Sequence, residues 1–147
     1  MGSEMCIRDR GNLKRSIIDL KGKTSKLETL SSQCCEFATV NPKFLGLKAS
    51  YSWMACTDKK IGNAPLQAIK KINLTTKEEI SWSAAPSGFV SEPIMVPSKS
   101  SNKEDEGYLF ILLWNGSRRG SDLVILCLLY TSPSPRDLST SRMPSSA

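Results

Sequence analysis

The stretch LKRSIIDLKGKTSKLETL, residues 13–30, places two strand-like runs on either side of Lys-Gly-Lys-Thr. A polar turn that contains glycine, between two such runs, predicts a β-hairpin. Its Ile-Asp-Leu segment at residues 18–20 returns as Ile-Asn-Leu at residues 72–74, again before a polar turn. Strand pairs that recur about every 50 residues are typical of β-propeller blades.

The rest of the chain has the same character. No stretch carries a sustained helical stripe, and prolines and glycines separate the apolar runs. The further strand-like runs are residues 51–56, 66–74, 94–96, 108–114 and 123–126. Because a blade takes about 40 to 50 residues, the sequence predicts an all-β, partial β-propeller of two to three blades with open edges. A small self-contained β-sandwich is the alternative.

The composition excludes several classes of enzyme. The chain has 147 residues, 39% of them hydrophobic, which is enough for one modest domain. It contains 20 lysines and arginines, 14 acidic residues and no histidine. This polypeptide alone therefore cannot carry a Ser-His-Asp or Cys-His site, an imidazole-ligated metal or an imidazole proton shuttle.

Location and partners follow from the apolar and charged patterns. The longest apolar run, residues 123–130, is much shorter than the roughly 20 residues of a membrane-spanning helix, and no signal peptide is visible. We therefore expect a soluble, cytoplasmic chain. The basic residues alternate with acidic ones, so nucleic-acid binding is not expected. The cysteines lack metal-site spacing and favour plain buried thiols. They are Cys6, Cys34, Cys35, Cys56 and Cys127.

The two ends resemble translated DNA adapter. Residues 127–137, CLLYTSPSPRD, can be back-translated into a transposase-type sequencing adapter, and residues 2–9 into the opposite strand of the same adapter. The alternative is an ordinary N-terminus with a disordered Ser/Pro-rich tail. We predict that residues 1–10 and 127–147 are adapter-derived, disordered and without a packed role. Residues 11–126 are then a native fragment of a longer protein, called the parent protein below.

Five blocks within residues 11–126 resemble the carotenoid cleavage oxygenases. They occur in the order in which similar blocks run through that family, and they are most similar to its cyanobacterial apocarotenoid oxygenase branch. The blocks are CCEFATVNP at 34–42, GNAPLQAI at 62–69, SEPIMVP at 91–97, EDEGYL at 104–109 and SDLVIL at 121–126. The resemblance implies a seven-bladed β-propeller, of which this chain holds two to three blades.

The resemblance also implies a metal centre. The family holds iron(II) on the propeller axis with four histidines, and glutamates stand behind three of them. Glu36 and Glu92 fall on two of those glutamates. A carboxylate that accepts the distal ring N–H of a ligating histidine fixes the tautomer and the orientation of the ring. The histidines and the third glutamate would lie outside this chain, which we expect to bind no iron and to be inactive.

The implied function is oxidative cleavage. The parent protein would be a carotenoid dioxygenase that uses O₂ to split a polyene double bond of a carotenoid or apocarotenoid into aldehyde products. The resemblance also allows peripheral membrane contact of the parent through segments absent from this chain. Two alternatives stay open: a metal-free β-propeller that acts as a binding or scaffold protein, and no function for the polypeptide as written.

Overall fold

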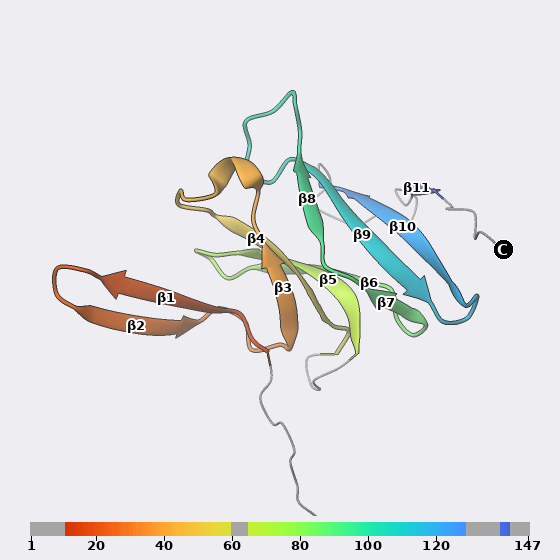
Figure 1. Ribbon diagram of the computed structural model, residues 1–147, viewed down its shortest axis with the longest axis horizontal. Helices are drawn as coiled ribbons and strands as arrows, with labels where there is room; N and C mark the ends of the chain where they lie inside the picture. Colours follow the sequence, from red (N-terminus) through yellow and green to blue (C-terminus); the bar gives the residue numbers. More distant parts are fainter. Residues whose placement is uncertain (1–10, 60–64, 129–138, 142–147) are drawn as a thin grey trace, which may run out of the picture.

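The computed structural model describes residues 11–59, 65–128 and 139–141 (Figure 1). Within these ranges almost all regular structure is β-strand, as predicted, and no helix is long and apolar enough to cross a bilayer. The one short 3-10 helix is η1 (Pro42–Phe44). The strands are β1 (Lys14–Asp19), β2 (Thr24–Thr29), β3 (Cys35–Thr39), β4 (Tyr51–Thr57), β5 (Leu66–Asn73), β6 (Glu79–Ser83), β7 (Gly88–Val90), β8 (Ile94–Pro97), β9 (Gly107–Asn115), β10 (Gly120–Cys127) and β11 (Ser139–Ser141).

The strands form antiparallel sheets that follow the chain order. Strands β3, β4, β5 and β6 make one four-stranded meander. In the next sheet β9 pairs with β10 on one side and with both β7 and β8 on the other, and β11 adds to β10. The hairpin β1–β2 precedes these strands in the chain and forms a separate two-stranded sheet. A four-stranded meander followed by a second antiparallel sheet, in which β7 and β8 share one side of β9, is the arrangement of successive propeller blades, so the predicted partial propeller is confirmed.

The core lies between the two larger sheets. Trp53 and Ile69 from the first sheet pack against Leu109 and Ile111 from the second. The opposite face of the first sheet is also covered, because Met54, Cys56 and Ile72 pack with Leu30 and Leu13 from the segments that flank the first hairpin. This two-sided burial explains why nearly all of β4 is buried.

Other apolar faces are open. Large side chains on β1, β2 and β9 remain exposed: Ile18 at 66%, Leu27 at 61%, Leu112 at 53% and Trp114 at 46%. Exposed apolar side chains that gather on one face mark a surface made for contact with another layer. The described residues thus form an open array of blades, as the short length of the chain led us to expect.

The repeated turn has a local cause. In each of three hairpins, the last residue of the first strand is Asp or Asn, and its side-chain oxygen accepts two backbone N–H groups of the turn. The three residues are Asp19, Asn73 and Asn115. Four residues after each, the backbone turns left-handed, at Lys23 (φ 51), Lys77 (φ 64) and Arg119 (φ 52). The echo between residues 18–20 and 72–74 is therefore a repeated Asx-type hairpin turn.

The expectation for the C-terminal end is wrong in part. Strand β10 continues to Cys127, the Leu128 N–H donates to the Gly107 carbonyl at 2.9 Å, and Leu128 packs against the core. Strand β11 pairs with β10. The reason is that the long strand β9 offers backbone partners as far as Gly107, and the apolar residues 123–128 can use them whatever their origin. Residues 1–10, 129–138 and 142–147 lie outside the described residues.

Candidate functional site

Glu36 lies in β3 immediately before a β-bulge. The pairing register with β4 shifts by one residue after Glu36, so that Phe37 and Ala38 stand opposite Met54 alone. Phe37 has a φ of 57°, in the left-handed region that side chains other than glycine rarely adopt. An extra residue bends a strand and re-aims the neighbouring side chains. The bulge leaves Glu36 exposed, on a strand that begins with a buried residue.

Glu92 lies at a second bulge. Strands β7 and β8 pair with β9 in registers that differ by one residue, so that residues 91–93 stand opposite residues 111–112. The Ser91 N–H donates to the Leu112 carbonyl at 2.9 Å, and the Leu112 N–H donates to Ser91 Oγ at 3.0 Å. The Ser91 hydroxyl thus takes the place of a backbone acceptor where the hydrogen-bond ladder with β9 is interrupted. Glu92, the next residue, is exposed.

The two glutamates occupy equivalent places in consecutive sheets. Strand β3 opens the first sheet, and β7 with β8 opens the second, and both stand at the edge of their sheet. Within the described residues, neither the Glu36 nor the Glu92 carboxylate makes a hydrogen bond or an ion pair. Bulges are over-represented beside active sites because they re-aim side chains. The fold therefore presents two carboxylates whose oxygens can accept hydrogen bonds from donors outside the described segment.

Gly11 makes a close approach to Glu36. The Cys35 N–H donates to the Gly11 carbonyl at 2.8 Å. A Cβ added to Gly11 would lie 2.9 Å from the Cys35 carbonyl oxygen and 3.5 Å from Glu36 Cγ. Since the nearest atom belongs to the backbone, it cannot yield without moving β3. Glycine at this position lets the first segment of the chain support the strand that carries Glu36.

We expect Gly11→Ala to displace β3 and to lower the stability of the chain by about 1–3 kcal/mol, the usual effect of overpacking. The measurement is the midpoint of urea denaturation. Gly120→Ala is the matched control, because a Cβ there would have its nearest neighbour 4.0 Å away, at the Arg118 carbonyl oxygen. Equal midpoints for the two variants would show that the close approach at Gly11 does not constrain β3.

The residues present do not make a metal-ligand set. The chain has no histidine, and within the described ranges no three acidic or cysteine side chains gather in a way that could hold a metal ion. Cys34, Cys35 and Cys56 are buried, as expected, whereas Cys127 is only partly buried and Cys6 lies outside the described residues. Burial raises the pKa of Cys35 and raises that of Cys56 to about 11. Neutral thiols are poor metal ligands and poor nucleophiles. The role predicted for Glu36 and Glu92, to orient ligands supplied by other segments, stays a prediction.

Comparison with known proteins gives a consistent set of matches. The family described as retinal pigment epithelial membrane protein (RPE65) matches residues 3–128. Apocarotenoid-15,15'-oxygenase from Synechocystis is 41% identical over 118 residues, which cover 80% of this chain. Lignostilbene-alpha,beta-dioxygenase isozyme III from Sphingomonas paucimobilis is 27% identical over 138 residues, which cover 86% of this chain.

The structural match agrees with the sequence matches. The crystal structure of cobalt-substituted Synechocystis apocarotenoid oxygenase superposes with a TM-score of 0.81 at 40% identity. It covers 85% of this chain and 26% of that protein. The chain spans about a quarter of the length of the curated relatives that it matches, 24% of one and 28% of the other.

Proposed function

The chain belongs to the RPE65/carotenoid oxygenase family, and from this membership we propose that residues 11–126 are part of an iron(II)-dependent carotenoid or apocarotenoid cleavage oxygenase. The identity to an apocarotenoid oxygenase supports this substrate class. The exposed apolar faces of β1, β2 and β9 support a longer parent protein, whose further blades would cover them. Bound iron(II) would supply the binding and activation of O₂ for cleavage of a polyene double bond to aldehydes.

The part played by this chain is to orient ligands. In the parent protein, Glu36 and Glu92 each accept a hydrogen bond from the distal ring N–H of a histidine that another segment supplies. A carboxylate acceptor at that nitrogen leaves the other ring nitrogen unprotonated and pointed at the metal, and raises its basicity. The observation that carries this proposal is the placement of both glutamates at bulges of equivalent edge strands, with no partner inside the described segment.

The test is to recover the sequence that flanks residues 11–126 in the source sample and to express the parent protein. We expect an open reading frame with four further histidines, about one iron per protein, and aldehyde products from an apocarotenal substrate. The 147-residue chain itself should retain no iron at micromolar concentration. A parent protein without those histidines, or one that binds no metal, would contradict the proposed function.

We further propose that residues 1–10 and 127–147 come from a sequencing adapter. The support for this division is that residues 2–9 and 127–137 can be back-translated into opposite strands of one adapter. The family match runs from residue 3 to residue 128 and so crosses both proposed boundaries. Amplification of the gene from source DNA should return different codons at both ends. Finding the codons for CLLYTSPSPRD intact after Leu126 would show that the C-terminal segment is native.

A further inference from the structure

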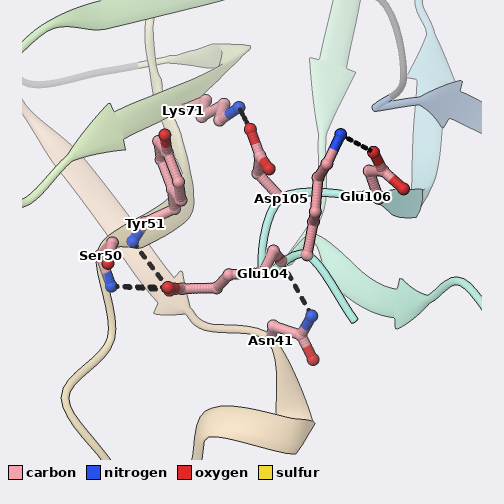
Figure 2. A network of polar contacts seen from close by, with 8 residues as sticks. Asn41, Ser50, Tyr51, Lys71, Glu104, Asp105 and Glu106 are labelled. Carbon is pink, nitrogen blue, oxygen red and sulfur yellow. Dashed lines mark hydrogen bonds and ion pairs between the residues drawn. The ribbon is translucent and has the colours of Figure 1, made fainter. Parts of the chain in front are cut away.

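The segments that follow β3 and β8 are held together by a buried polar network (Figure 2). The Asn41 side-chain amide donates to the Glu104 carbonyl at 2.8 Å. The Glu104 carboxylate accepts the Ser50 N–H at 2.7 and 2.9 Å and the Tyr51 N–H at 2.9 Å. Asn41 is 0% exposed and Glu104 is 9% exposed. We call these four residues the Asn41–Glu104 clasp.

Both polar atoms of the Asn41 side chain form hydrogen bonds. Asn41 Oδ1 accepts the Lys43 N–H at 3.0 Å, so this side chain caps η1 while its amide nitrogen reaches Glu104. Hydrogen bonds to an ionised carboxylate are stronger than those between neutral groups. Nearby, Lys71 Nζ forms an ion pair at 2.8 Å with Asp105, the residue after Glu104. This pair is more exposed than Asn41 and Glu104. The clasp is therefore the buried part of this contact, and the Lys71–Asp105 pair is its exposed neighbour.

The clasp joins the segment that follows the strand of Glu36 to the loop that follows β8, the strand next to Glu92. Strand β3 bears Glu36 and ends two residues before Asn41. Strand β8 begins two residues after Glu92, and its C-terminal end leads into the loop that contains Glu104. Strands β3 and β8 belong to different sheets, so no backbone ladder fixes one against the other. A side-chain link between the two segments is then a means of setting their relative position.

We propose that Asn41 and Glu104 are positioning residues of the parent oxygenase: their clasp fixes β3, which carries Glu36, against β8, which begins just after Glu92. The proposal rests on the proposed function, because it assumes that both carboxylates orient ligands of one metal centre. Two acceptors that serve the same centre must keep a fixed separation, and misplacement by about 1 Å can lower the efficiency of such a site by two orders of magnitude. The far end of β3 also pairs with β4, through Thr39 opposite Trp53. Lys43 Nζ, which donates to the Ser98 and Ser101 carbonyls at 3.0 and 3.2 Å, adds an exposed link between the same two segments, so the clasp is their buried link.

The test compares clasp variants of the parent protein in the cobalt-substituted form, whose visible absorption reports the geometry of the ligands. Glu104→Ala should change the cobalt spectrum, lower metal retention about 10-fold, and speed amide hydrogen exchange of residues 40–51 in the metal-free protein. Glu104→Gln keeps one acceptor oxygen and should restore part of the retention. Asp105→Asn breaks only the exposed ion pair with Lys71 and should leave the spectrum and the retention unchanged.

A stability control separates positioning from general support of the fold. Ile72→Val removes a methylene from the opposite face of the first sheet, where Ile72 is 0% exposed. Glu104→Gln or Asn41→Asp could lower stability as Ile72→Val does and yet leave the cobalt spectrum and the metal retention at wild-type values. That result overturns the proposal. A wild-type parent that binds no metal overturns the proposed function instead. If Glu104→Ala does not fold, the Glu104→Gln and Asn41→Asp results decide the question.

Discussion

Changing both Glu36 and Glu92 to glutamine in the parent protein is expected to lower iron retention by about 100 to 10,000-fold. Loss of one carboxylate behind a ligating histidine typically costs 10 to 100-fold in metal affinity. The range for the double variant is the product of two such losses, the value expected if each carboxylate acts through its own histidine. Glutamine keeps the shape of the side chain but replaces the anionic acceptor with a neutral amide. Both glutamates are exposed at edge strands, so the fold itself should be almost unaffected.

The measurement is iron content after dialysis against a chelator, with thermal denaturation recorded in parallel. Glu78→Gln serves as the control, because Glu78 is an exposed carboxylate in the turn after β5 and has no place at a bulge. Each single variant should lie between the wild type and the double variant. Wild-type iron content in both single variants would mean that the ligand-orienting role belongs to other carboxylates.

Changing Glu79 to glutamine should lower the free energy of unfolding of this chain by about 3 kcal/mol, the lower part of the range for breaking a buried ion pair. The Lys70 side chain is only 2% exposed, and its Nζ lies 2.8 Å from Glu79 Oε2 and 3.2 Å from Ser31 Oγ. The variant leaves the ammonium group buried with a neutral neighbour. Because the Glu79 side chain is 29% exposed, solvent weakens the effect below that of a fully buried pair.

The matched variant is Lys70→Met, which keeps most of the length of the side chain and removes the buried charge. Replacing a buried ion by an apolar side chain of similar volume is often neutral or stabilising. Urea denaturation followed by tryptophan fluorescence should therefore place Lys70→Met near the wild type and Glu79→Gln well below it. If Lys70→Met lowers the free energy of unfolding as much as Glu79→Gln does, the loss comes from the missing ion pair and not from an unpaired buried charge.

Features that depend on short-range contacts can be predicted from the amino-acid sequence. The hairpin turns after Asp19 and Asn73 are set by side-chain bonds to amides two and three residues further on. Such a bond needs no partner from elsewhere in the chain. The strands of residues 51–56 and 108–114 were predictable for a similar reason, since dense apolar, β-branched and aromatic residues bounded by glycine and proline mark a buried strand. Five short blocks then indicated the family.

The positions of the edge strands and of the bulges depend on tertiary contacts. Strands β3 and β7 are short and partly exposed, so their composition does not distinguish them from loops. The bulges beside Glu36 and Glu92 exist because β3, β7 and β8 must match the registers of β4 and β9, which lie elsewhere in the chain.

The same reason accounts for the clasp and for the C-terminal extension of β10. Glu104 meets backbone groups more than 50 residues away in sequence, and Cys127 is held by its pairing with Tyr108. The conformation of a turn is set by residues that are neighbours in the sequence. The register of a strand and the position of a buried carboxylate are set by backbone groups that are distant in the sequence and that packing brings close. The register of a strand and the partners of a buried carboxylate therefore depend on the whole fold and cannot be predicted from a local sequence pattern.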